Sequence, residues 1–198
     1  AVAIDANSGL VLYNKNMDER MYPASMTKVM TAIVALDMIE NLDKTTVITQ
    51  SDIDTVWETG ASSANFEVGE TVTYRDLLLG AILPSGADAT RALANNLCGS
   101  QEAFVEKMNE CAKKLKLKDT HFVNTTGIHD DNHYTTVHDM ALIVQYAVAN
   151  PTFKEIYSKR YATSSNGLHQ WVNKSVYNAK RSNINTDSII GCKSGYTD

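Results

Sequence analysis

The first hydrophobic positions form two short runs, residues 1–6 and 10–13, on either side of Asn7-Ser8-Gly9. Short apolar runs around such turn residues predict a β-hairpin, so we expect a sheet to begin the domain. The next hydrophobic run, from Met26 to Glu40, is apolar on almost every side. A helix without a polar face belongs in the interior of a domain. We therefore expect this helix to be central and buried.

Helical spacing of apolar residues dominates the middle of the chain. It predicts helices over residues 73–83, 87–97, 101–117, 136–148 and from 151 onward, the first of them ending before Pro84. Ser100 is a plausible cap for the helix that follows it, and Thr136 with Asp139 resembles a capping box. We expect a helical lobe over about residues 60–150 within one domain covering 1–198.

The periodic signal weakens toward the end of the chain. Residues 164–167 and 183–187 resemble loops, and Ile189 to Cys192 resembles a short buried strand. Strands at both ends and helices between them predict a mixed α/β (α+β) fold.

Composition narrows the function classes. The 18 basic and 23 acidic residues give a net charge of −5 without a basic run, which argues against a nucleic-acid surface. No apolar stretch approaches the roughly 20 residues of a membrane span, so membrane attachment is expected only through a segment absent from this sequence. The three cysteines form no metal-like cluster and cannot build a dense disulfide framework.

Candidate chemistry begins at Ser25-Met26-Thr27-Lys28. A spacing of three residues on a helix places a hydroxyl and an amine on one face. A lysine can accept the serine proton only if its neutral form is favoured, and apolar surroundings supply that pressure. The interpretation without a catalytic role is a serine at the start of a helix beside a solvated lysine. An idle charge at the head of an apolar helix would be costly, so we favour a nucleophile with its base.

Two further polar sequences complete a constellation. Lys193-Ser194-Gly195 follows the apolar pair 189–190, and its charge, hydroxyl and lack of a side chain at the glycine suit a carboxylate and an extended substrate backbone. Ser85 lies at the junction of two predicted helices, where its side chain could point into a cleft. Either sequence alone would indicate only a polar turn. Their order along the chain is what favours a single site.

These motifs carry a family resemblance that covers essentially the whole chain. The segments 24–32, 83–89, His121-Phe122-Val123-Asn124 with Gly127, and 191–198 resemble the low-molecular-mass penicillin-binding proteins of the D-alanyl-D-alanine carboxypeptidase family. The resemblance implies a fold similar to serine β-lactamases and transpeptidases. Such a fold has an antiparallel sheet flanked by helices, a helical lobe, and the active site between them.

The resemblance also implies residue roles. Ser25 would be the acylated nucleophile, Lys28 its general base, and Ser85 a proton shuttle toward the leaving D-alanine. Lys193 and Ser194, with Gly195 beside them, would hold the terminal carboxylate of a peptidoglycan stem peptide ending in D-Ala-D-Ala. The main-chain N–H groups of Ser25 and Tyr196 would form the oxyanion hole. The resemblance further implies acylation by β-lactam antibiotics, no metal or organic cofactor, and an extracytoplasmic location at the bacterial cell wall.

The sequence departs from the family pattern in three places. The second motif normally reads Ser-x-Asn, but Ala87 replaces the asparagine, which would lower activity. Ser63-Ala64-Asn65 and Ser164-Ser165-Asn166 spell the same pattern outside its context, and we interpret both as coincidences. Ser194 replaces the usual threonine and keeps the hydroxyl. The chain stops three residues after Gly195, so we expect the C-terminal strands of the family to be missing from this sequence.

Three alternatives remain at this point. A metal hydrolase could use histidines and aspartates, although their spacing fits no common motif: His121, His129, His133 and His138 with Asp130, Asp131 and Asp139. A serine β-lactamase would share the acyl-enzyme but needs a glutamate for deacylation, and no convincing Glu-x-x-Leu-Asn sequence is present. A catalytically impaired peptidoglycan-binding or penicillin-sensing module would explain Ala87.

Overall fold

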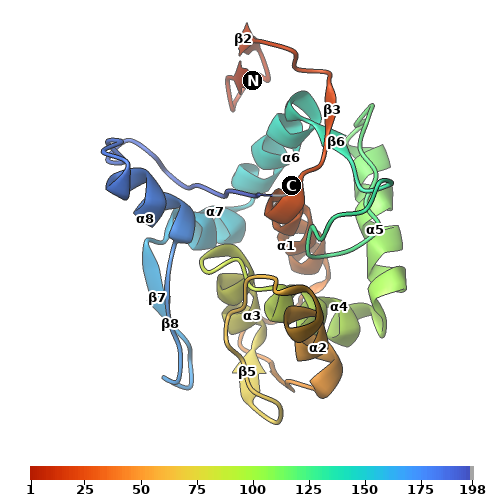
Figure 1. The fold of residues 1–198 in the computed structure, drawn as a ribbon, viewed down its shortest axis with the longest axis vertical. Helices are drawn as coiled ribbons and strands as arrows, with labels where there is room; N and C mark the ends of the chain where they lie inside the picture. Colours follow the sequence, from red (N-terminus) through yellow and green to blue (C-terminus); the bar gives the residue numbers. More distant parts are fainter. Residues whose placement is uncertain (197–198) are drawn as a thin grey trace.

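The computed structural model describes residues 1–196. Helices are the main regular structure in this part of the chain, and the strands are short (Figure 1). The elements are β1 Val2–Ile4, β2 Val11–Asn14, β3 Arg20–Met21, the 3-10 helix η1 Ala24–Met26, α1 Thr27–Met38, β4 Thr45–Val47, α2 Gln50–Thr59, β5 Thr71–Thr73, α3 Tyr74–Ile82, α4 Ala87–Cys98, α5 Gln101–Lys114, β6 Thr135–Thr136, α6 Val137–Ala149, α7 Pro151–Ser158, β7 Tyr161–Thr163, β8 Gln170–Val172 and α8 Lys174–Arg181.

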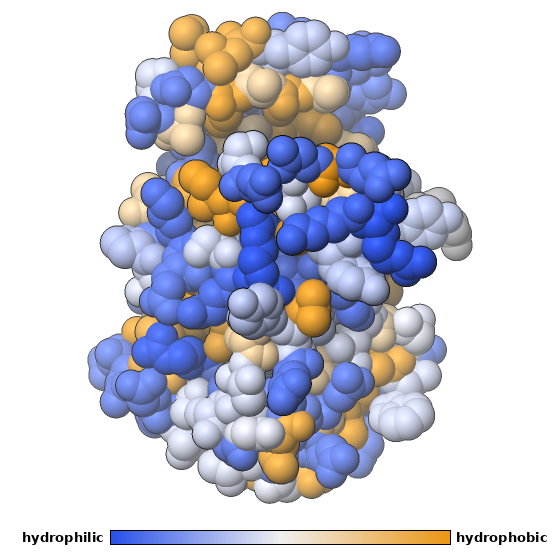
Figure 2. Space-filling view, turned by 90° about the vertical axis from the view of Figure 1, so that its left-hand side faces the viewer, coloured by the Kyte–Doolittle hydropathy of each residue, from blue (hydrophilic) through white to orange (hydrophobic). Residues whose placement is uncertain are grey.

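All strand pairing within residues 1–196 is antiparallel and two-stranded, in the order β1–β2, β3–β6, β4–β5 and β7–β8. The predicted first hairpin is confirmed: Asp5 closes its turn by accepting hydrogen bonds from Ser8, and Gly9 takes the left-handed conformation with φ of 73°. Leu10 and Leu12 are 64% and 65% exposed on this hairpin. Figure 1 places this hairpin at the upper end of the molecule, and Figure 2 shows hydrophobic residues gathered at the same end. The expected mixed fold class with antiparallel pairing is confirmed.

Helix α1 lies at the centre of the molecule (Figure 1) and contacts α3, α4, α5, α6 and α7. Every residue from Thr27 to Ala35 is buried, as the missing polar face of this segment predicted. The buried set includes Lys28, which is 1% exposed. The core helix therefore carries an amine into the interior at its first turn.

The predicted helix boundaries follow from local caps. Ser100 accepts a hydrogen bond from the third residue of α5, and Pro151 occupies the first turn of α7. Thr136 likewise accepts the N–H of Asp139 at the start of α6. The reciprocal half of that capping box is not formed, because the Asp139 carboxylate accepts N–H groups from residues 118–119 instead. Asp139 thus ties the start of α6 to the end of the α5 region.

The predicted strand from Ile189 to Cys192 is wrong. Neither Ile189 nor Cys192 belongs to a β-ladder in the structure, and Ile190 between them is 59% exposed. Their carbonyl oxygens accept hydrogen bonds from the side chains of Arg160 and Asn173. A strand requires a neighbouring main chain for its ladder, and no such neighbour lies here among residues 1–196.

Helices α2 and α8 were not predicted from the sequence. Thr49 and Asp52 form a complete capping box at the start of α2, and Asn173 caps α8 by accepting the N–H of Val176. Both helices are short and polar, so each offers only a few apolar residues from which a helical period could be predicted. Between residues 1 and 196, no helix is both long and apolar enough to cross a membrane.

Candidate active site

Ser25 and Lys28 lie together at the start of α1. The Nζ atom of Lys28 is 2.9 Å from Oγ of Ser25, and it donates a hydrogen bond of 2.6 Å to the main-chain carbonyl of Thr126. The hydroxyl is partly buried and the amine fully buried. The three-residue spacing therefore brings a hydroxyl and an amine within proton-transfer distance.

The surroundings of Lys28 favour its neutral form. Burial holds the pKa of Lys28 well below its ordinary value, the positive charge of Lys193 lowers it further, and Lys174 acts in the same direction. Asp88 opposes these effects. An amine that loses its proton easily can accept the proton of a serine hydroxyl.

Lys193 is a second buried amine with a different protonation. Its Nζ atom donates hydrogen bonds to Oγ of Ser85 at 2.9 Å and to the carbonyl of Ser194 at 2.7 Å. Burial lowers the pKa of Lys193 to about 8, and Lys174 contributes to this shift. The protonated form of Lys193 therefore still predominates at pH 7. The site thus combines a base at Lys28 with a cation at Lys193.

Two glycines pack closely against the main chain at Ser25. A Cβ atom on Gly127, whose φ is 84°, would lie 1.8 Å from the carbonyl oxygen of Ala24. A Cβ atom on either Gly127 or Gly195 would lie 2.9 Å from the main-chain nitrogen of Ser25. Asn124 holds the first glycine in place, since its Oδ1 accepts the Gly127 N–H at 2.7 Å. The main chains of both glycines therefore lie closer to the main chain at Ser25 than a residue with a Cβ atom would allow.

Two residues without glycine's freedom adopt left-handed backbone conformations at this site. Ala24, next to Ser25, has φ of 47°, and Ser85 has φ of 69°. Such conformations cost about 1–3 kcal/mol each and cluster at active sites. Here one lies directly before Ser25 and the other is Ser85 itself, and both serines line the same cleft.

A cleft of about 730 Å³ connects these groups. The structure brings all seven predicted site residues into its lining: Ser25, Lys28, Ser85, Lys193, Ser194, Gly195 and Tyr196. Lys174 and Ser175, from the first turn of α8, also line it and were not predicted, although the capping residue Asn173 before them is a sequence signal for a helix start. None of the described residues lining the cleft is an aspartate or glutamate. The cleft therefore suits an anionic ligand.

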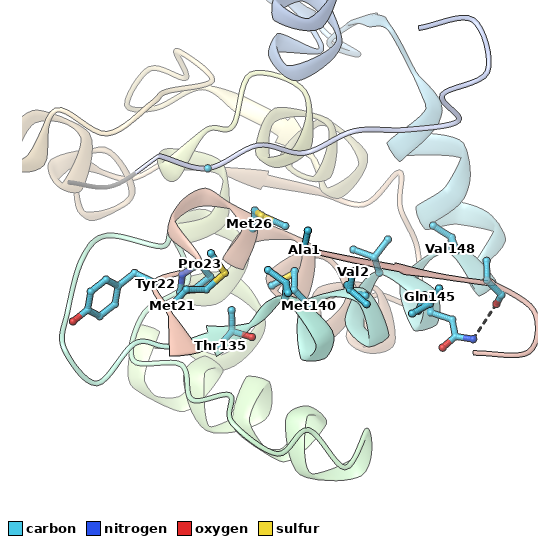
Figure 3. Close-up of a pocket in the computed structure, with 16 residues that line it drawn as sticks. Ala1, Val2, Met21, Tyr22, Pro23, Met26, Thr135, Met140, Gln145 and Val148 are labelled. Carbon is cyan, nitrogen blue, oxygen red and sulfur yellow. Dashed lines mark hydrogen bonds between the residues drawn. The ribbon is translucent and has the colours of Figure 1, made fainter. Parts of the chain in front are cut away.

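A second cavity, of about 590 Å³, is lined mainly by apolar residues (Figure 3). Gly195 lines both this cavity and the polar cleft that contains Ser25. The second cavity lies between the first hairpin and α6, where Gln145 donates a hydrogen bond of 3.0 Å to the carbonyl of Ala6. Its lining contains neither lysine nor carboxylate among the described residues. The chemistry suggested by the sequence is therefore confined to the polar cleft.

The family departures noted in the sequence have clear positions. Ala87 is fully buried at the start of α4, where its N–H donates to the carbonyl of Ser62, so it presents no group to the cleft. The hydroxyl of Ser63 binds Asp88 and that of Ser164 binds Asn166, and neither serine lines the cleft. Both alternative Ser-x-Asn sequences are therefore structural. Thr197 and Asp198, the end of the last motif, lie outside the described residues.

The histidines do not form one site. Among residues 1–196, no group of three or more histidine, cysteine or carboxylate side chains is placed to hold a metal ion. His133 is buried against Thr27, whereas His138 lies 3.3 Å from Asp18. All three cysteines are free thiols. The positions of these side chains give no support to the metal-hydrolase alternative.

Comparisons with known proteins agree over the whole chain. The family model described as D-alanyl-D-alanine carboxypeptidase matches residues 1–198. Bacillus subtilis D-alanyl-D-alanine carboxypeptidase DacF is 36% identical over 207 residues, covering 100% of this chain and 50% of that protein. DacA of Escherichia coli K12 is also 36% identical, with 100% and 49% covered. The chain spans about half the length of these curated relatives.

Solved structures show the same similarity. The crystal structure of the Streptomyces K15 DD-transpeptidase superposes with a TM-score of 0.89 at 32% identity, covering 99% of this chain and 79% of that one. Penicillin-binding protein 5 from Haemophilus influenzae gives a TM-score of 0.87 at 31% identity, with 99% and 56% covered.

Proposed function

Because the chain belongs to the D-alanyl-D-alanine carboxypeptidase family, we propose that it removes the terminal D-alanine from peptidoglycan stem peptides through an acyl-enzyme on Ser25. One observation carries the proposal: Lys28 Nζ lies 2.9 Å from Ser25 Oγ in a cleft lined by two further lysines. A nucleophile, a neutral base and a cationic carboxylate site are the groups that this reaction requires.

The proposed reaction starts with transfer of the Ser25 proton to neutral Lys28. Oγ attacks the carbonyl carbon of the penultimate D-alanine, and the Ser25 N–H stabilises the oxyanion in the space beside Gly127 and Gly195. The carbon–nitrogen bond then breaks, and the proton taken up by Lys28 passes through Ser85 to the departing amine, which leaves Lys28 neutral again. Water next attacks the acyl ester, releasing the shortened peptide and restoring the Ser25 hydroxyl.

Protonated Lys193 and the Ser194 hydroxyl would hold the terminal carboxylate of the stem peptide. A β-lactam also carries a carboxylate beside a reactive carbonyl, so we expect it to acylate Ser25. The peptidoglycan substrate places the proposed activity at the bacterial cell wall, outside the cytoplasm.

The serine β-lactamase alternative is disfavoured by the cleft. A serine β-lactamase uses a glutamate to deacylate its penicilloyl-enzyme rapidly, and the described lining of the cleft contains no carboxylate. The impaired-module alternative is favoured by one observation, the buried Ala87 in place of the family's asparagine. That alternative has the same site as the proposed carboxypeptidase and differs from it in the rate of turnover.

Intact-mass spectrometry after incubation with penicillin G tests the proposal. We expect a stable adduct on the protein and none on Ser25→Ala. Ser62→Ala is the matched control, because it removes an exposed serine of the same cleft and should leave the adduct intact. Release of D-alanine from a peptide ending in D-Ala-D-Ala is measured alongside.

Each outcome separates one function from the others. An adduct with D-alanine release supports the carboxypeptidase, and release only with an added amine acceptor would favour peptide transfer. An adduct without release would favour a sensing module. Rapid penicillin hydrolysis would favour a β-lactamase, and absence of any adduct would refute Ser25 as the nucleophile.

A further inference from the structure

Side chains at the start of α8 hold the segment that carries Lys193. Asn173 Nδ2 donates to the carbonyl of Cys192 at 3.4 Å. Ser175 makes two shorter contacts: its Oγ accepts the main-chain N–H of Ser194 at 2.8 Å and lies 2.8 Å from the Ser194 hydroxyl oxygen. These hydrogen bonds occupy the place where a strand ladder would otherwise fix the segment.

The two hydroxyls differ in exposure. Ser175 is 9% exposed, whereas Ser194 is exposed within the lining of the cleft. A hydroxyl has one hydrogen to donate and can accept two hydrogen bonds. When Ser194 donates its hydrogen to an anion in the cleft, the hydrogen between the two oxygens must come from Ser175. Ser175 then accepts from the Ser194 N–H and donates to the Ser194 hydroxyl.

Ser194 needs such a partner because its side chain is unbranched. A β-branched residue is restricted in χ1 by its own second substituent, and serine lacks that restriction. Two hydrogen bonds to one buried oxygen fix both the main chain and the hydroxyl of Ser194. A hydroxyl already directed into the cleft loses less entropy when it binds a ligand.

We propose that Ser175 is a positioning residue for carboxylate recognition, acting by orienting the Ser194 hydroxyl toward the terminal carboxylate of the substrate. The inference rests on the proposed carboxypeptidase function. It implies that the effect of replacing Ser175 on activity depends on which residue occupies position 194. A purely structural serine would show no such dependence.

The test measures D-alanine release by the purified protein and its variants. Removing one neutral hydrogen-bond partner by Ser175→Ala should lower kcat/KM for a peptide ending in D-Ala-D-Ala by about 3- to 10-fold. The carboxylate is bound before and during the reaction, so the loss should be mainly in KM. For the same peptide with a C-terminal amide, the leaving group is D-alanine amide, and release of that product should fall less than about 2-fold in the variant, because the amide peptide has no carboxylate for Ser194 to hold.

A second variant supplies the restriction that Ser194 lacks. In the Ser194→Thr background the β-branch holds the hydroxyl, and Ser175→Ala should then cost less than about 2-fold. Ser182→Ala is the matched control, since it removes an exposed serine hydroxyl at the other end of α8. Circular dichroism and thermal unfolding verify that each variant is folded.

Equal losses for the carboxylate and amide peptides, or equal losses with and without the Ser194→Thr substitution, would overturn the positioning role while leaving the proposed function intact. Failure of the unaltered protein to release D-alanine and to be acylated by penicillin G would overturn both. Selective loss on the carboxylate peptide with rescue by threonine is the expected result.

Discussion

Replacing His133 should change how the stability of the protein depends on pH. The side chain is 2% exposed, its Nδ1 accepts the Val123 N–H at 3.1 Å, and its Nε2 lies 2.7 Å from Oγ1 of Thr27. Since Nδ1 is an acceptor, the neutral ring carries its hydrogen on Nε2 and donates it to Thr27. Thr27 lies between Ser25 and Lys28, so this histidine supports the start of α1.

The magnitude follows from the pKa of the buried ring. Burial lowers the pKa of His133 to about 4, with Asp130 opposing and His121 adding to the effect. An unfolded histidine has a pKa of about 6.5. Between these values the unfolded state binds a proton that the folded state does not, so stability falls as pH decreases. Linkage gives a loss of about 2 kcal/mol between pH 7 and pH 5, and the loss levels off below about pH 4.

Urea unfolding followed by tryptophan fluorescence measures this loss, since Trp171 is buried. His133→Gln removes the titrating ring, so the stability difference between the unaltered protein and the variant should shrink by about 2 kcal/mol from pH 7 to pH 5. His129→Gln is the matched control, because that side chain is 48% exposed, and it should reproduce the unaltered pH dependence. Parallel losses for His133→Gln and the unaltered protein would refute the reasoning.

Three other substitutions give sharp expectations. Gly127→Ala places a Cβ atom 1.8 Å from a main-chain carbonyl oxygen and should abolish penicillin acylation in mass spectrometry, whereas Gly99→Ala, also left-handed but in open space, should not. Lys174→Gln removes a charge that lowers the pKa of Lys28, so the acid limb of the acylation rate should move to higher pH. Asp88→Asn turns an amide toward main-chain N–H donors and should lower the unfolding free energy in urea by about 1–3 kcal/mol.

Contrary results would have specific meanings. Normal acylation of Gly127→Ala would show that the loop can move away from η1. An unchanged pH profile for Lys174→Gln would remove this lysine from the electrostatics of the base. Unaltered stability of Asp88→Asn would mean that its carboxylate is not needed to hold residues 63–66.

Local features of this protein could be predicted from the sequence because they depend on neighbouring residues. The spacing of Ser25 and Lys28 sets a hydroxyl and an amine on one helix face whatever surrounds them. The apolar run of α1 predicted its burial, and Ser100 and Pro151 marked helix starts through their own hydrogen-bonding and backbone properties. The motif order then carried the family resemblance that the comparisons confirm.

Contacts between distant residues were decided by the tertiary structure. Lys193 reaches Ser85 across 108 positions, and the carbonyl that accepts from Lys28 comes from Thr126, 98 positions away. Ser175 could not be predicted as a site residue, because the sequence around it does not show which segment α8 packs against. The same limit explains the wrong strand before Lys193, since an apolar run becomes a strand only where another main chain completes its hydrogen bonds.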